Sequence, residues 1–125
     1  MPIRVVIVDD QQMFLDALRS LLTLEDDIDV VATTREPRAV ADISSDADVV
    51  LMDIVLPTAD GLELTRQVRA TRPDQQVIVI SGRSDDGAER EALDAGAAAF
   101  LLKGGLGPEV AQTIRRVTAD QGLTG

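Results

Sequence analysis

Five short runs rich in β-branched residues recur along the chain, and segments with helical periodicity separate them. Four of the runs are almost continuously apolar, which is typical of strands covered on both faces of a parallel sheet. The runs are Arg4–Val8, Asp29–Thr33, Asp48–Met52, Gln76–Ile80 and Ala98–Leu102. Because strand-like and helix-like segments alternate, the sequence predicts one α/β domain with helices on both faces of a parallel sheet.

Apolar residues at helical spacing predict the helices between the strands. The first helix has one apolar face, formed by Phe14, Leu15, Leu18, Leu21 and Leu22. Gly96 is predicted to end a helix over Ala88–Ala95, and Pro108 to begin the last helix. The last helix carries Val110, Ile114 and Val117 on its apolar face. Met13 and Met52 are predicted to fill gaps in the core.

Charge and composition narrow the possible functions. The net charge is −10, and a field of that sign repels the phosphates of nucleic acids, so we expect no direct DNA binding by this domain. The chain has no histidine and no cysteine, so a bound metal would need oxygen ligands, which favours a hard cation such as Mg²⁺. No apolar run is long enough to span a membrane, and the absence of cysteine suits the cytoplasm.

Polar residues follow four of the predicted strands at the point where each strand ends. These residues are Asp9, Asp10, Asp53, Ser81 and Lys103. In a doubly wound sheet, ligands bind beyond the carboxyl ends of the strands, so these side chains are predicted to converge there. Clustered carboxylates repel one another unless a cation lies among them, and Mg²⁺ is the natural candidate. Asp53, facing Ser81 and Lys103, is the natural nucleophile for a phosphoryl group that the metal and Lys103 would neutralise.

Each of these residues also has a plainer interpretation. An aspartate at a strand end is often a turn former or a helix cap, Ser81 before Gly82 could form a turn, and Lys103 could be solvated. Phe100 is a core residue by default. The appearance of four polar groups after four strands, all at one edge, favours a site over four separate coincidences.

The ordered set of motifs resembles the receiver domain of bacterial two-component response regulators. The matching stretches are Val6–Asp10, Leu51–Pro57, Asp60–Gly61, Val77–Gly82 and Gly96–Lys103. The beginning of the chain and Leu101–Lys103 are similar to the NarL/FixJ-type branch. The resemblance implies a doubly wound, five-stranded parallel sheet of order 2-1-3-4-5 with helices on both faces, the flavodoxin-like receiver fold. It places the domain at residues 3–121, with 122–125 as a tail or the start of a linker to a missing C-terminal helix-turn-helix domain.

The same resemblance implies roles for individual residues. Asp53 would be the phosphoacceptor, supplied by a phosphohistidine on a sensor histidine kinase. Asp10 and Asp53 would bind Mg²⁺ directly, Asp9 would act mainly through water, and the Val55 backbone carbonyl would be a further ligand. The Lys103 ammonium would pair with the phosphoryl oxygens.

Switching would follow from phosphorylation. Ser81 would hydrogen-bond the phosphoryl group and move inward, and Phe100 would rotate to follow it. The face around the fourth helix, the fifth strand and the fifth helix would then change shape. This change would alter partner or homodimer contacts and so control transcription, in a domain expected to be cytoplasmic.

The chain departs from the usual receiver pattern at several positions. Gly104 stands where many receivers have proline after the lysine, so a cis peptide bond is not expected there. Ser81 replaces the commoner threonine, and Val55 is apolar where relatives are often polar. The pair Gln11-Gln12 replaces a more usual acidic or histidine neighbourhood.

Two other classes of function compete with a phosphorylated receiver. A receiver-like module could act by dimerisation or docking without phosphorylation, although such a module has no need of the acidic residues, the hydroxyl and the lysine. An enzyme on the same architecture, either a flavin protein or a phosphate-ester hydrolase, is the other alternative. The sequence lacks a glycine-rich phosphate loop after the first strand, which argues against the flavin version.

Overall fold

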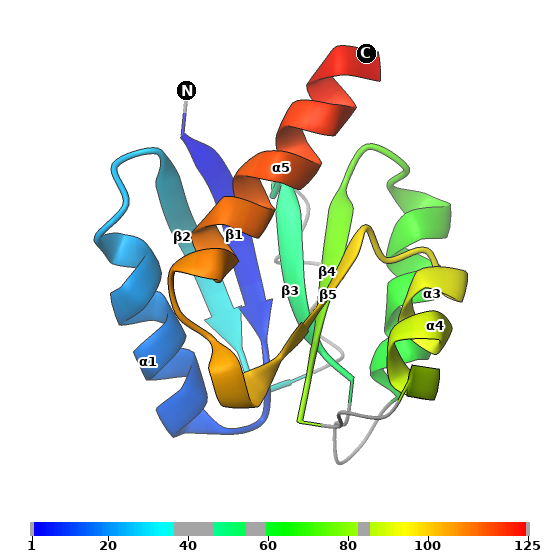
Figure 1. Cartoon of the computed structure of the whole chain (residues 1–125), viewed down its shortest axis with the longest axis horizontal. Coiled ribbons are helices and arrows are strands. Elements are labelled where there is room, and N and C mark those ends of the chain that lie inside the picture. Colours follow the sequence, from blue (N-terminus) through cyan, green and yellow to red (C-terminus); the bar gives the residue numbers. More distant parts are fainter. Residues whose placement is uncertain (1, 37–46, 55–59, 83–85, 125) are drawn as a thin grey trace.

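Five parallel strands form one sheet at the centre of the structure, in the order β2-β1-β3-β4-β5 (Figure 1). The computed structural model describes residues 2–36, 47–54, 60–82 and 86–124. The strands are β1 (Ile3–Val8), β2 (Ile28–Thr34), β3 (Val49–Asp53), β4 (Gln76–Ser81) and β5 (Ala99–Leu102). Each bound lies within one residue of the bound predicted from the sequence, and the predicted strand order is confirmed.

Helices cover both faces of this sheet. They are α1 (Gln12–Thr23), α3 (Gly61–Thr71), α4 (Asp86–Asp94) and α5 (Pro108–Thr124), with a short 3₁₀ turn, η2 (Lys103–Gly105). Helices α1 and α5 lie on one face, and α3 and α4 lie on the other (Figure 1). As predicted, Pro108 begins α5, and Gly96 follows α4 with a positive φ of 106°. Helix α5 continues to Thr124, and the predicted boundary between residues 121 and 122 stays a prediction.

Two apolar clusters, one on each face of the sheet, hold the layers together. The first joins β-strand residues such as Ile7 and Leu51 to Leu15, Leu18 and Leu22 of α1 and to Val110, Ile114 and Val117 of α5. The second joins Val8, Met52 and Val79 to Val68 of α3 and Ala92 of α4. These contacts confirm the apolar helix faces that the sequence predicted.

The prediction for Met13 was wrong, whereas Met52 is fully buried as predicted. The Met13 side chain is 86% exposed. Successive helix residues are about 100° apart, which places Met13 well off the face of α1 that is centred on Leu18. Met13 therefore points to solvent.

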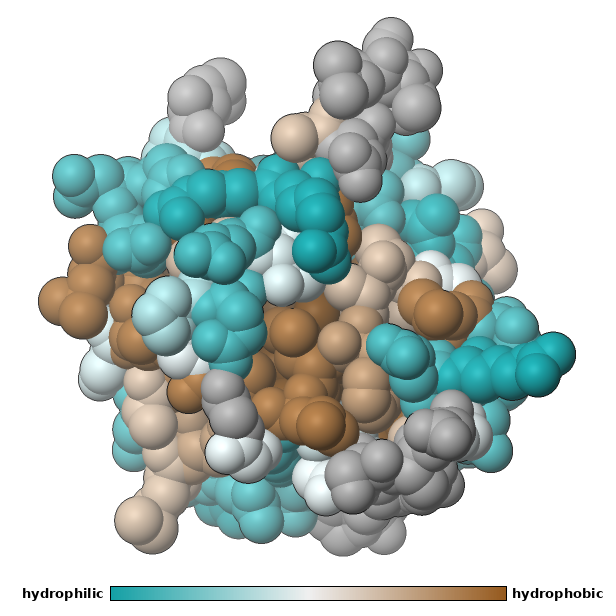
Figure 2. All heavy atoms as spheres, in the orientation of Figure 1, coloured by the Kyte–Doolittle hydropathy of each residue, from teal (hydrophilic) through white to brown (hydrophobic). Residues whose placement is uncertain are grey.

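Some apolar surface remains open around β5. Leu93 of α4 and Leu102 of β5 are 48% and 43% exposed, and Phe100 is half-buried. Figure 2 shows hydrophobic residues gathered over β5 on the face that carries α5. In the described part of the chain, no helix combines the length and the apolar character needed to cross a membrane.

Glycine is required where α3 begins above the end of β3. The Gly61 amide donates to the Ile54 carbonyl at 3.2 Å. A Cβ atom at position 61 would overlap the Asp53 carbonyl oxygen and lie 2.8 Å from Ile54 Cα. Both neighbours are backbone atoms, so they cannot move aside as a flexible side chain could. Gly61 thus allows α3 to pack closely on the strand that carries Asp53.

We expect Gly61→Ala to lower the free energy of unfolding by about 2 kcal/mol or more, because the added methyl group meets backbone. Gly82→Ala is the matched control, since a Cβ atom there meets nothing within 4 Å. That control should change stability by less than about 0.5 kcal/mol. Urea denaturation followed by circular dichroism measures both, and equal effects of the two variants would contradict the packing explanation.

An ion-pair group ties α5 to the connection between α1 and β2. The Arg115 guanidinium donates to both carboxylate oxygens of Asp27, at 2.7 and 2.8 Å, and to Glu25 Oε1 at 2.8 Å. The Arg115 hydrogen bonds lower the pKa of Asp27 below its ordinary value of 3.8. Because the folded-state pKa is lowered, the pair stabilises the fold above pH 3.8 and loses this effect as the pH falls through the folded-state pKa.

Replacing Arg115 with Gln should therefore lower the urea midpoint modestly at pH 7, as expected of a surface ion pair. The difference from wild type should shrink only below pH 3.8. Urea titrations of both proteins across the acid range measure this. A difference that grows on acidification would show that the charge pair is not its cause.

Candidate functional site

Three carboxylates meet at the carboxyl edge of the sheet, as the sequence predicted. Asp9 directly follows β1, Asp10 is the next residue, and Asp53 is the last residue of β3. One oxygen of each lies within 4.8 Å of the others. Asp9 and Asp53 are 1% and 4% exposed, and Asp10 is half-buried. Carboxylates that lie this close together and are buried from water repel one another strongly unless positive charge lies among them.

The sheet register explains this convergence. Val8 pairs with Met52, and Asp53 pairs with Ile80, so the ends of β1, β3 and β4 lie side by side. The Asp9 amide continues the ladder by donating to the Thr34 carbonyl at 3.1 Å. The next turn is closed by the Gln11 amide, which donates to Asp9 Oδ1 at 2.9 Å. Asp9 therefore does form a turn, which was the alternative to a role in the site. This turn uses only one of its two carboxylate oxygens.

Lys103 supplies positive charge to the cluster. Its Nζ atom lies 2.8 Å from Asp9 Oδ2 and 3.4 Å from Asp53 Oδ2, and its side chain is only 17% exposed. The alternative of a solvated lysine is therefore wrong. Burial lowers the pKa of Lys103, but hydrogen bonding and charge from Asp9 and Asp53 outweigh this effect, so its pKa is raised overall. The ammonium remains protonated and partly neutralises the cluster.

Two residues of the first helical turn also contact the Lys103 ammonium. Gln11 Oε1 accepts a hydrogen bond from Nζ at 3.1 Å, and the Phe14 ring centroid lies 4.6 Å from Nζ. Sequence reasoning assigned neither residue to the site. Gln11 carried one signal: it is the N-terminal cap of α1, yet its side chain makes no cap hydrogen bond, and glutamine is not among the preferred capping residues.

Arg35 is a third residue that the sequence did not assign to the site. It directly follows β2, and its Nε donates to the Asp10 carbonyl oxygen at 2.9 Å. This hydrogen bond attaches the β1–α1 loop to the edge of β2. It therefore steadies the segment that carries Asp9 and Asp10.

Ser81 and Phe100 lie in the strands next to the carboxylates. Ser81 is the last residue of β4, is fully buried, and directly follows Ile80, which pairs with Asp53. Phe100 lies opposite Val79 and packs against the apolar cluster beneath α3 and α4. Its core contacts agree with the default prediction. Val55 lies outside the described residues. The peptide bond after Lys103 is trans, as expected for Gly104.

The carboxylate cluster has the donor set of a metal site. Asp9, Asp10 and Asp53 can each offer one carboxylate oxygen, and these oxygens lie within 4.8 Å of one another. A single ammonium, that of Lys103, offsets only part of their negative charge. A set of oxygens alone suits a hard metal ion. The residues present therefore fit the metal site of a receiver.

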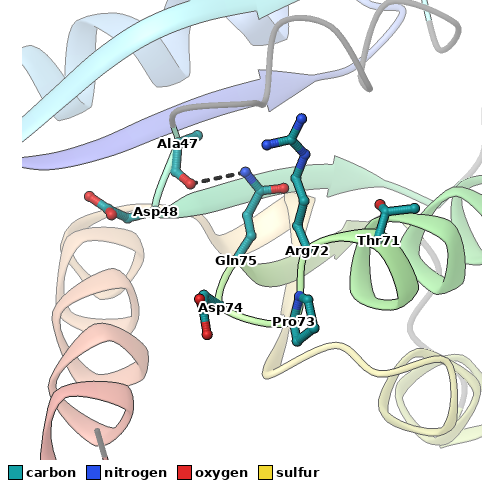
Figure 3. A pocket seen from close by; sticks show the side chains of 7 residues that line it. All are labelled: Ala47, Asp48, Thr71, Arg72, Pro73, Asp74 and Gln75. Atoms are coloured by element: carbon teal, nitrogen blue, oxygen red, sulfur yellow. Dashed lines mark hydrogen bonds between the residues drawn. The ribbon is translucent and has the colours of Figure 1, made fainter.

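A separate hollow lies at the opposite edge of the sheet, where β3 and β4 begin (Figure 3). Its volume is about 360 Å³, and the Gln75 side chain crosses it to donate to the Ala47 carbonyl oxygen at 2.9 Å. The lining residues are Ala47, Asp48, Thr71, Arg72, Pro73, Asp74 and Gln75. Since Asp48 and Gln75 precede the strands whose far ends carry the site, this hollow is not part of it.

Known proteins share both the sequence and the fold of this chain. Residues 5–115 match the family described as "Response regulator receiver domain". The "Transcriptional regulatory protein LnrK" of Bacillus subtilis is 35% identical over 81% of this chain and 47% of its own length. The "Transcriptional regulatory protein DesR" of the same species is 36% identical over 92% of this chain and 58% of its own length.

Among solved structures, the signal receiver domain of the putative response regulator NarL from Mycobacterium tuberculosis is similar to this chain. It superposes with a TM-score of 0.82 and 27% identity, over 96% of each chain. The chain spans about half the length of the curated relatives that it matches first. With the acidic cluster and the sheet order, the match over most of its length shows that this chain belongs to the response regulator receiver domain family of two-component systems, among relatives of the NarL type.

Proposed function

We propose that this domain accepts a phosphoryl group on Asp53, in a Mg²⁺-dependent reaction, from a phosphohistidine of a sensor histidine kinase. One observation carries the proposal: the buried Asp53 carboxylate lies beside a carboxylate pair and an ammonium group, 3.4 Å from Lys103 Nζ. This arrangement places a nucleophilic oxygen where positive charge can receive the oxygens of an incoming phosphoryl group.

The transfer exchanges one bond to phosphorus for another. A carboxylate oxygen of Asp53 forms a bond to phosphorus as the bond from phosphorus to the donor imidazole nitrogen breaks. The electron pair of that bond stays on the imidazole nitrogen. Lys103 pairs with the phosphoryl oxygens and offsets their charge, and positioning supplies most of the catalysis in such a transfer.

Asp10 and Asp53 are the residues proposed to bind Mg²⁺ directly, with Asp9 acting through water and the Val55 carbonyl as a further ligand. When bound, Mg²⁺ neutralises carboxylate and phosphoryl oxygens together. Asp10 is half-buried and reaches both the solvent side and the cluster, which supports its proposed role as a ligand.

The conformational change caused by phosphorylation is proposed to pass from Asp53 to the surface of the domain through Ser81 and Phe100. Ser81 would hydrogen-bond the phosphoryl group and move inward, and Phe100 would rotate to follow it. The α4–β5–α5 face would then change its contacts with a partner or with a second copy of the chain. The partial exposure of Leu93 and Leu102 on that face gives such contacts apolar surface to bury.

The output is proposed to be control of transcription in the cytoplasm. The curated relatives that support this are named transcriptional regulatory proteins, and this chain covers only 47% and 58% of their length. DNA binding would belong to a C-terminal helix-turn-helix domain beyond this one, because the net charge of −10 here repels DNA.

Acetyl phosphate with Mg²⁺ should add one phosphoryl group to the wild-type protein, as measured by intact-mass spectrometry. Asp53→Asn should not be labelled, because the amide removes the nucleophilic oxygen, and chelation of Mg²⁺ should abolish labelling of the wild type. A receiver of known activity is the positive control. If wild type stays unlabelled while this control reacts, the phosphorylation-independent docking module becomes the better explanation.

Mg²⁺ should also stabilise the folded protein, because the carboxylates are brought together only in the native state. At one hundred times its dissociation constant, Mg²⁺ should add about 2.7 kcal/mol to the free energy of unfolding. Asp10→Asn should lose most of this gain. Thermal unfolding of both proteins with and without Mg²⁺ measures it, and an equal gain in the variant would exclude Asp10 as a ligand.

A further inference from the structure

The Lys103 ammonium has two kinds of contact in the pocket. Two are with charged carboxylates, Asp9 and Asp53, at 2.8 and 3.4 Å. The other two are with uncharged groups at the start of α1, the amide oxygen of its cap residue Gln11 and the Phe14 ring. A metal ion would compete with Lys103 for the carboxylate oxygens, but it would not compete for the aromatic ring. The contacts with α1 are thus the ones that persist when the carboxylates take up a cation.

Phe14 is well placed to hold the ammonium. Its side chain is half-buried and packs against the core cluster formed by α1 and α5 with the sheet, which restricts the position of the ring. The ring centroid lies 4.6 Å from Nζ, within the range of about 6 Å for a cation–π contact. Because the lysine side chain is only 17% exposed, water screens this attraction weakly.

Gln11 connects the same lysine to the turn that carries the carboxylates. Its backbone amide donates to Asp9 Oδ1 at 2.9 Å, while its side-chain oxygen accepts from Lys103 at 3.1 Å. The residue stands at the cap position of α1 without capping the helix. Residues that break a local preference in this way are often found at functional sites.

We propose that Phe14, supported by Gln11, is a positioning residue that holds the Lys103 ammonium in the pocket and thereby sets the rate at which Asp53 is phosphorylated. This inference rests on the proposed function of Asp53. It adds to that function Phe14 of α1 and Gln11, the cap residue before that helix, both of which act through the lysine.

Phe14→Leu keeps an apolar side chain and removes the ring face, whereas Phe14→Tyr keeps the ring face. At saturating Mg²⁺, Phe14→Leu should lower the rate constant of labelling by acetyl phosphate about fivefold, and Phe14→Tyr should restore most of it. In a Lys103→Met background, Phe14→Leu should cause no further loss. If Leu and Tyr lower the rate equally, or if Leu still lowers it without the lysine, Phe14 only packs the core and the proposal is overturned.

Gln11→Ala tests the second contact without disturbing the core, because this side chain is exposed. It should lower the rate constant about threefold, in keeping with the loss of one exposed hydrogen bond. Gln12→Ala is the matched control, since the neighbouring glutamine donates to Asp16 Oδ1 at 2.9 Å instead. Equal rates for the two variants would remove Gln11 from the proposal.

Nuclear magnetic resonance tests the position of Lys103 without phosphorylation. In the Mg²⁺-free protein, the Hε protons of Lys103 should be shifted upfield by the Phe14 ring. The shift should persist in Phe14→Tyr and vanish in Phe14→Leu, and its absence in wild type would overturn the positioning role. If the shift is present but wild type accepts no phosphoryl group, the proposed function fails while the placement of Lys103 by Phe14 stands.

Discussion

Mutual repulsion among Asp9, Asp10 and Asp53 is the constraint on which the site depends. The parallel register of β1, β3 and β4 forces these residues to one edge, where Asp9 and Asp53 are almost completely buried. The Lys103 ammonium offsets part of this repulsion, because Lys103 follows β5 and contacts both buried carboxylates. A partly neutralised cluster of oxygens is therefore built into the fold, and its donor set is consistent with the metal site of receiver domains.

Close packing around this edge keeps the charged groups in place. Gly61 lets α3 approach the backbone of Asp53 and Ile54, and Arg35 holds the carbonyl of Asp10. On the other side, the first turn of α1 contacts the lysine through Gln11 and Phe14. The two helices that begin next to the site are thus in contact with it, and each also packs into the core of its own face.

Much of the fold and of the candidate site could be predicted from the sequence, because the patterns that specify strands and strand ends are local. Buried parallel strands require continuous apolar runs, so all five strands were located within one residue. The residue after such a strand must lie at the carboxyl edge, so Asp9, Asp53 and Lys103 were correctly brought together. The prediction for Met13 was wrong because the angular position of a residue on an amphipathic helix, and not its residue type, decides whether its side chain reaches the core.

The sequence by itself determined the order of strands and helices along the chain and the acidic edge of the sheet, since both follow from residue type and spacing. Its motifs also resemble a receiver family, and the match to that family established the membership. Tertiary structure alone decided that Gln11 and Phe14 contact Lys103, because both are separated from it by about ninety residues of sequence. It also decided why position 61 must be glycine, since that depends on how closely α3 approaches β3. Contacts between distant segments are set by the register and the packing of whole layers, and no local pattern encodes them.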